Sequence, residues 1–217
     1  MSEHMALENL TVLDLTRVLA GPFCTMMLAD MGANVIKIEV PKGGDDTRSY
    51  PPFRAKNLNG ERESVYFANI NRNKKGITLN LKAPEGKEIF KELVKKADIV
   101  VENYRPGVMD KLGLGYDVLK EINPRIIYAA VSGFGCYGPY HLRPGYDILA
   151  QAMGGMMSIT GSKGGEPTRA GSALGDILGG LHVTIGILAA VNARTITGKG
   201  QRVDVSLMDS MIAATEN

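Results

Sequence analysis

Short apolar runs alternate with amphipathic segments from the start of the chain. Residues 10–15 and 33–39 have the pattern of buried strands, and the segment between them places Met26, Met27 and Met31 on one helical face. A strand, a helix and a strand within about thirty residues form a βαβ unit, which implies parallel pairing of its two strands.

The same alternation continues along the chain. Residues 76–82 alternate as a strand does, Pro84 stands where a first-turn proline is favoured, and residues 85–97 place their apolar side chains on one stripe. The elements predicted after these are a strand at 98–103, a helix at 116–123 and a strand at 125–134. Strands that alternate with helices in this way predict a doubly wound α/β sheet.

Polar and basic residues follow the predicted strands. In such sheets ligands bind beyond the carboxyl ends of the strands, so these residues are expected to converge on one edge. They are Arg17, Asn80, Lys82, Asn103 and Arg105. Each alone could be an ordinary loop residue, but together they favour a phosphate-bearing ligand. The first turn, "TRVLAGP", is not the GxGxxG of dinucleotide-binding proteins, and the sequence has no Walker A motif.

Composition narrows the class of partner. The chain has 217 residues, a formal net charge of +2 and 26 glycines, so its charge favours neither nucleic acid nor an anionic membrane. Cys24 and Cys136 are far apart and fit two reduced thiols, and the N-terminus does not resemble a signal peptide. The longest apolar run, 178–191, is shorter than a bilayer requires. We therefore expect a cytoplasmic protein, with residues 1–4 a possible cloning remnant.

One carboxylate, Asp176, stands between a glycine-rich turn and that apolar run. Aspartate is a favoured helix N-cap, so capping is one interpretation of this position. The other is nucleophilic catalysis: an ordinary carboxylate has a pKa near ~4, so it is an anion at pH 7 and needs no partner base. The three histidines, at 4, 141 and 182, form neither a catalytic triad nor a metal-ligand spacing, and we predict no metal site.

Five motifs in order resemble the class III CoA-transferase family, which also contains the α-methylacyl-CoA racemases. The motifs are "DLTRVLAGPFCTMMLADMGANVIKIE", "NRNKKGITLNLKAPEG", "VENYRPGVMDKLGLGYD", "RPGYDILAQAMGG" and "GSALGDILGGLHVTIGILAA". The resemblance implies a Rossmann-like parallel sheet with flanking helices, within a fold in which two subunits interlock. It also implies an N-terminal portion of a longer protein. We expect a tail at 1–9, a Rossmann-like CoA-binding and catalytic domain at 10–200, and the start of the next segment at 201–217.

The resemblance also assigns roles to individual residues. Asp176 matches the catalytic aspartate, which takes the acyl group from CoA as a mixed anhydride. Tyr146 and Asp147 match active-site positions beside the thioester. The positions implied for coenzyme A are Leu19, Ala20, Leu79, Asn80, Lys82, Asn103, Tyr104, Arg105 and Lys111. Leu19 stands where formyl-CoA transferases have glutamine, which disfavours a formyl and oxalyl substrate pair.

The resemblance implies a CoA-transferase that acts on an acyl-CoA and a small carboxylic acid, as a homodimer and with no tightly bound cofactor. One alternative is a racemase, but members with that activity pair the aspartate with a histidine where this chain has Tyr146. Tyrosine is a poor base at neutral pH. A second alternative is a non-catalytic CoA-binding fragment. A nicotinamide-dependent oxidoreductase is disfavoured by the first turn.

Overall fold

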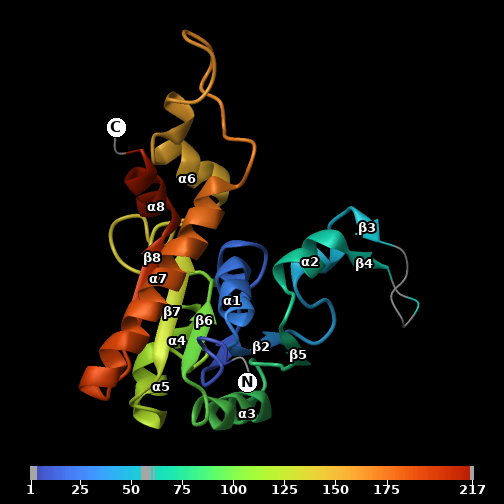
Figure 1. Ribbon diagram of the computed structural model, residues 1–217, viewed down its shortest axis with the longest axis vertical. Coiled ribbons are helices and arrows are strands. Elements are labelled where there is room, and N and C mark those ends of the chain that lie inside the picture. The colour runs from blue at the N-terminus through green and yellow to red at the C-terminus, as the bar shows by residue number, and fades with distance from the viewer. Residues whose placement is uncertain (1–3, 55–59, 61, 216–217) are drawn as a thin grey trace.

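A parallel sheet with helices on both faces forms the body of the protein (Figure 1). The computed structural model describes residues 4–54, 60 and 62–215, and over these residues the sheet has six strands in the order β5-β2-β1-β6-β7-β8. The strands are β1 (Thr11–Asp14), β2 (Asn34–Glu39), β5 (Lys75–Thr78), β6 (Ile99–Glu102), β7 (Ile127–Ser132) and β8 (Arg202–Ser206). Every neighbouring pair in it is parallel, which confirms the predicted α/β class.

Alternate residues of each strand face opposite sides of the sheet, and each side has its own apolar core. On one side Val12 and Val101 pack among residues of α1 (Ala20–Asp30) and α7 (Leu174–Thr197). On the other side Leu13 and Val100 pack with α3 (Pro84–Val94) and α5 (Tyr116–Ile122). The remaining helices of the sheet region are α4 (Val108–Lys111), α6 (Asp147–Met153) and α8 (Leu207–Ala214), with a short 3-10 turn, η2 (Met156–Ser158).

The 24-residue helix α7 is longer than the apolar run suggested. By length and composition alone it could cross a membrane, but it packs along α1 and the sheet, where Val183, Ile187 and Ala190 are fully buried. Its glycines allow this close packing: a Cβ at Gly180 would lie 2.7 Å from the carbonyl oxygen of Ala20, for example. α7 is therefore a core helix of this domain.

Two features of the chain depart from the sequence prediction. The segment after residue 200 provides β8, which pairs with β7 in the same sheet, although a further segment was expected to begin there. The described residues between 45 and 70 (45–54, 60 and 62–70) form an excursion that the pattern did not predict, called the 45–70 excursion below (Figure 1). Its elements are η1 (Asp46–Ser49), β3 (Phe53–Arg54), β4 (Glu63–Ser64) and α2 (Val65–Ile70).

Candidate active site

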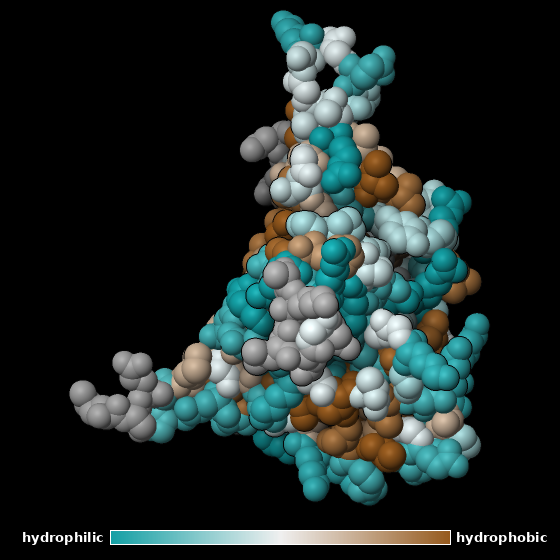
Figure 2. All heavy atoms as spheres, turned by 90° about the vertical axis from the view of Figure 1, so that its right-hand side faces the viewer, coloured by the Kyte–Doolittle hydropathy of each residue, from teal (hydrophilic) through white to brown (hydrophobic). Residues whose placement is uncertain are grey.

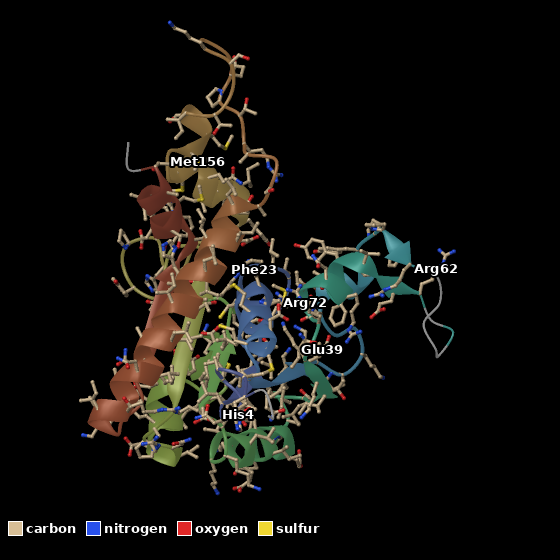
Figure 3. The ribbon with its side chains drawn as sticks, in the orientation of Figure 1. His4, Phe23, Glu39, Arg62, Arg72 and Met156 are labelled. Atoms are coloured by element: carbon tan, nitrogen blue, oxygen red, sulfur yellow. The ribbon has the colours of Figure 1, made fainter. Side chains whose placement is uncertain are left out.

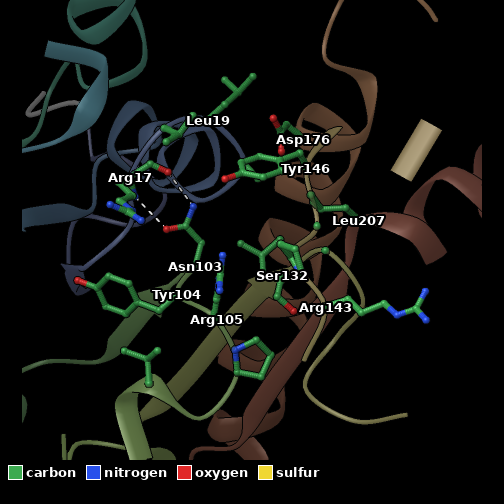
Figure 4. Close-up of a pocket in the computed structure, with 18 of the residues that line it drawn as sticks. Arg17, Leu19, Asn103, Tyr104, Arg105, Ser132, Arg143, Tyr146, Asp176 and Leu207 are labelled. Atoms are coloured by element: carbon green, nitrogen blue, oxygen red, sulfur yellow. Dashed lines mark hydrogen bonds between the residues drawn. The ribbon is translucent and has the colours of Figure 1, made fainter. Parts of the chain in front are cut away.

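A cavity of about 500 Å³ lies beyond the carboxyl ends of β1 and β6, where the strand order of the sheet reverses (Figure 4). This is the position at which doubly wound sheets bind ligands. Its walls come from residues 17–20 after β1, 103–106 after β6, 131–133 at the end of β7, and 143–146, together with Asp176 and Leu207. The cavity therefore joins segments that are far apart in the sequence.

Hydrogen bonds join the loops after β1 and β6 at the cavity wall. The Arg17 backbone N–H donates to Asn103 Oδ1 at 2.9 Å, and Asn103 Nδ2 donates to the Arg17 carbonyl at 2.7 Å (Figure 4). Arg17, Arg105 and Arg143 all line the cavity. The Arg17 guanidinium pairs with Asp46 at 3.2 Å and is half-exposed. Arginine side chains at a cavity wall suit an anionic ligand such as one that carries phosphates.

A buried carboxyl supports the second of these loops. Glu102 Oε2 accepts a hydrogen bond of 2.7 Å from the Tyr104 backbone N–H, and Glu102 Oε1 accepts one of 3.1 Å from the Tyr128 hydroxyl. Burial raises the pKa of Glu102 to about 7, against the lowering effect of these two bonds. Glu102 thus lies beneath the cavity wall and fixes the backbone at Tyr104.

Asp176 is the third residue of α7, inside its first turn. The N-cap position belongs to Ala173 and has no side-chain cap bond, so the interpretation of Asp176 as a cap is wrong. Its carboxylate lines the cavity, and among the described residues it accepts no hydrogen bond and forms no ion pair. The free N–H groups of the first turn and the helix dipole still favour negative charge there.

The pKa of Asp176 differs from the ordinary value that the sequence analysis assumed. Burial first, and then the negative charge of Asp147, raise this pKa to about 7. At pH 7 roughly half of the free protein therefore carries the proton on Asp176. A carboxylate with a higher pKa is more basic, and its anion is a better nucleophile once it forms.

Asp147 binds the segment that leads into α7. Its Oδ1 accepts a hydrogen bond of 2.8 Å from the Gly175 backbone N–H, and its Oδ2 accepts one of 2.8 Å from Gln151 Nε2. Gln151 Oε1 in turn accepts from the Ala170 N–H at 2.9 Å. The first residue of α6 thus fixes the backbone on which Asp176 stands.

The structure brings together most of the predicted site residues, but not all. The predicted residues that line the cavity with Asp176 are Leu19, Ala20, Asn103, Tyr104, Arg105 and Tyr146. Leu19 and Tyr146 lie beside the Asp176 carboxylate in Figure 4. The predicted residues that do not line the cavity are Asp147, Leu79, Asn80, Lys82 and Lys111. Asp147 lies behind the cavity wall, where it binds the Gly175 backbone. Leu79, Asn80 and Lys82 follow β5 at the edge of the sheet, and Lys111 is an exposed residue of α4, so their binding role stays a prediction.

The two glycines that follow Asp176 in α7 lie where the helix packs against its neighbours. A Cβ at Gly179 would clash with Leu207 Cδ2, and a Cβ at Gly180 would lie 2.7 Å from the Ala20 carbonyl oxygen of α1. Both glycines are therefore needed for helix packing. Gly171, by contrast, has open space around its Cβ position.

Sequence reasoning missed several residues that line the cavity. They are Ser132, His141, Arg143 and Leu207. Ser132 is the last residue of β7 but lies inside the strand predicted at 125–134, so the strand-end rule would have found it only with the correct end of that strand. Arg143 carried no such signal, because it lies in a loop without periodicity. Leu207 was missed because residues 201–217 were expected to lie outside the CoA-binding domain. The Arg143 guanidinium stacks over the Tyr140 ring at 4.1 Å and extends away from Asp176 (Figure 4).

Comparisons with known proteins agree with this geometry. The family model described as CoA-transferase family III matches residues 7–217. An acetyl-CoA:oxalate CoA-transferase of Acetobacter aceti is 50% identical over 95% of this chain and 52% of its own length. A succinyl-CoA:mesaconate CoA-transferase of Haloarcula marismortui is 48% identical over 97% of this chain and 54% of its own length.

A solved structure gives the same result. The crystal structure of a CAIB/BAIF family protein from Brucella suis is 45% identical, with a TM-score of 0.93 over 97% of this chain and 55% of that one. The chain therefore spans about half the length of the relatives it matches. The strand order of the sheet and the cavity where that order reverses agree with the family match over residues 7–217. The chain therefore belongs to CoA-transferase family III.

Proposed function

We propose that the full-length protein is a CoA-transferase that moves CoA from an acyl-CoA to a carboxylic acid through covalent intermediates on Asp176. The observation on which this depends most is the Asp176 carboxylate, which faces the cavity at the head of α7 without a hydrogen-bonded or charged partner of its own among the described residues. Family membership and the activities for which the relatives are named support the reaction class.

The first step forms one bond and breaks one. An oxygen of the Asp176 carboxylate attacks the thioester carbonyl carbon, and the carbon–sulfur bond breaks to release the CoA thiolate. The product is a mixed anhydride between Asp176 and the donor acyl group. The oxyanion that develops needs N–H donors, and one well-placed donor is worth about 3 kcal/mol in such a step. Arg17 and Arg105 at the basic end of the cavity are suited to the phosphates of CoA.

The remaining steps return the enzyme to its starting state. The thiolate attacks the Asp176 carbonyl of the anhydride, the donor leaves as a free acid, and Asp176 becomes a thioester of CoA. The acceptor carboxylate attacks that thioester, forms a second anhydride and releases the thiolate again. The thiolate then attacks the acceptor carbonyl, which produces the new acyl-CoA and restores the Asp176 carboxylate. Atoms and charge balance without an added base or metal.

Small carboxylic acids are the acceptors we propose. The two relatives reported above are named for mesaconate and oxalate, and their donors are named as succinyl-CoA and acetyl-CoA. Because a relative at 50% identity is named for oxalate, oxalate belongs among the acids to test, although Leu19 was expected to disfavour it.

An exchange assay tests this proposal. The full-length protein is incubated with succinyl-CoA or acetyl-CoA and a panel of small mono- and dicarboxylic acids, and new thioesters are identified by chromatography and mass spectrometry. We expect at least one new acyl-CoA, formed together with an equal amount of donor acid. A protein that binds CoA tightly and forms no new thioester with any acid would be a binding module instead.

The racemase alternative has one observation in its favour. A carboxyl group with a pKa of about 7 is suited to general acid–base catalysis at neutral pH. The residue expected on the opposite face of the substrate is Tyr146 rather than histidine, which disfavours it. Rapid deuterium exchange at the α-carbon of a bound acyl-CoA, without thioester transfer, would establish racemase chemistry.

We propose that the full-length protein is a homodimer of interlocked subunits, in keeping with its family. The chain leaves several large apolar side chains exposed, among them Leu142, Ile148 and Ile185. Figure 2 shows separate hydrophobic patches on an otherwise hydrophilic face. Light scattering after size exclusion should give twice the subunit mass, and a single-subunit mass would contradict the proposal.

A further inference from the structure

The turn after β1 contains an unusual backbone conformation at the cavity wall. Val18 has φ of 68°, in the left-handed region, where a β-branched side chain is strongly disfavoured. Val18 lines the cavity between Arg17 and Leu19. A strained conformation of this kind persists only where the surrounding structure enforces it.

A buried ion pair lies directly behind this turn. Lys37 Nζ and Asp45 Oδ2 are 2.9 Å apart, and the two side chains are 2% and 1% exposed. Lys37 Nζ donates a hydrogen bond of 2.8 Å to the Thr16 carbonyl, and Asp45 Oδ1 accepts one of 3.2 Å from the Val18 backbone N–H. The pair therefore binds the backbone on both sides of Arg17.

Other contacts keep Asp45 in place. Its Oδ1 also accepts from the Thr47 backbone N–H and from the Thr47 hydroxyl, at 3.0 and 2.8 Å. Its own backbone N–H donates to Glu39 Oε1 at 2.8 Å. Arg48 in turn donates to both oxygens of Glu39, which lies between the sheet and the 45–70 excursion (Figure 3). These bonds give the excursion a link to the first turn of the cavity.

We propose that Asp45 and Lys37 are positioning residues that enforce the left-handed conformation of Val18 and so set the wall of the CoA cavity. This rests on the proposed function, because the cavity is taken to hold an acyl-CoA. Neither residue lines the cavity, so their effect on binding passes through the backbone of residues 16–18. Leu19, next in the chain, is the wall residue that lies beside Asp176 (Figure 4).

A double-mutant cycle in the full-length protein tests the proposal, with CoA affinity measured by calorimetry and KM and kcat by thioester exchange. The Asp45→Asn variant should bind CoA roughly 10-fold more weakly, because the buried charge that accepts the Val18 N–H is lost. Val18→Gly should restore most of that loss in the double variant, because glycine adopts φ near 68° without strain. The effect should appear in KM more than in kcat.

If Asp45 only stabilised the fold, Asp45→Asn would lower the melting temperature, and Val18→Gly would not restore the affinity for CoA. Asp45→Asn with wild-type CoA affinity, or a loss that Val18→Gly does not reduce, would overturn the proposal. A wild-type protein that binds no CoA would overturn the proposed function as well, which is a distinct result. Asp30→Asn, at the exposed pair with Arg72, is the matched control and should leave affinity unchanged.

Should Asp45→Asn fail to fold, Lys37→Gln tests the pair from its other side. Glutamine is uncharged and one bond shorter than lysine, so Asp45 loses its cation and the bond to the Thr16 carbonyl is weakened or lost. Lys37→Gln should also bind CoA roughly 10-fold more weakly, and Val18→Gly should restore most of that affinity in the double variant. The absence of either result would overturn the proposal.

Discussion

The protein buries carboxylates in two regions and treats them in opposite ways. At the end of β1, Asp14 is fully buried and Lys74 Nζ lies 3.1 Å from its Oδ2, while Thr16 and Thr25 donate hydrogen bonds to it. Burial tends to raise the pKa of Asp14, but Lys74, Lys37 and these hydroxyls outweigh it and lower the pKa. At the head of α7, Asp176 lies beside another carboxylate, and its pKa is raised to about 7.

The difference separates structural from chemical use of the same side chain. Asp14 supports the fold and is paired with a cation, since an unpaired buried charge is costly. Glu102, which also supports the fold, has no cation partner among the described residues, but its two oxygens accept hydrogen bonds. Asp176 keeps its charge uncompensated within the described part of the molecule, which costs stability but leaves a lone pair available for attack. Perturbed groups of this kind in a cavity mark functional sites.

Removal of the uncompensated carboxylate should abolish transfer. We expect Asp176→Asn to lower thioester exchange by about 10³-fold or more, because an amide is a very poor nucleophile. Asp209→Asn is the matched control: Asp209 is also the third residue of its helix, α8, but it is exposed and outside the cavity lining. Near-normal exchange by the Asp176→Asn variant would show that this carboxylate is not the nucleophile.

Removal of the cation from the paired carboxylate should instead affect stability. Lys74→Met leaves Asp14 buried without its nearest charge, and we expect a loss of about 3–5 kcal/mol in the free energy of unfolding. Lys75→Met changes the adjacent, exposed lysine and should stay within about 0.5 kcal/mol. Urea unfolding measures both. Equal losses in the two variants would show that the pair contributes little.

Replacement of Asp176, by contrast, should raise the free energy of unfolding at neutral and alkaline pH. The folded pKa of Asp176 lies above the unfolded value of 3.8, so its contribution is fully present below pH 3.8 and is lost as pH rises through about 7. At pH 8 we therefore expect Asp176→Asn to be more stable than the wild type by roughly 1–3 kcal/mol, a range discounted for partial exposure. The difference should shrink at pH 5. Denaturant unfolding at both pH values tests the sign.

The smallest expected effect is a shift in the pH profile of the first step when the charge of Asp147 is removed. Asp147→Asn keeps the oxygen that accepts from Gly175 but removes the charge, so the pKa of Asp176 should fall. The rate of CoA release in the first step should then reach its plateau at lower pH than in the wild type. Since burial is the larger cause, part of the shift should persist. A pH profile with an unchanged midpoint would contradict the electrostatic role of Asp147.

The sequence predicted the features that depend on local pattern. The βαβ unit of β1, α1 and β2 and the convergence of Asn103 and Arg105 on the cavity follow from periodicity and the strand-end rule. The left-handed Val18 could not be predicted, because valine normally avoids that conformation and the enforcing contact comes from Asp45, 27 positions away. The raised pKa of Asp176 depends on burial, which appears only once α6 and α7 meet.

The central claim is that Asp176 carries the acyl group from CoA, and covalent trapping tests it most directly. The full-length protein is incubated with acyl-CoA, treated with hydroxylamine or borohydride, digested and analysed by peptide mass spectrometry. We predict a hydroxamate or a reduced side chain at Asp176, dependent on acyl-CoA and absent from the Asp176→Asn variant. Active exchange with Asp176 unmodified under the same conditions would contradict the account.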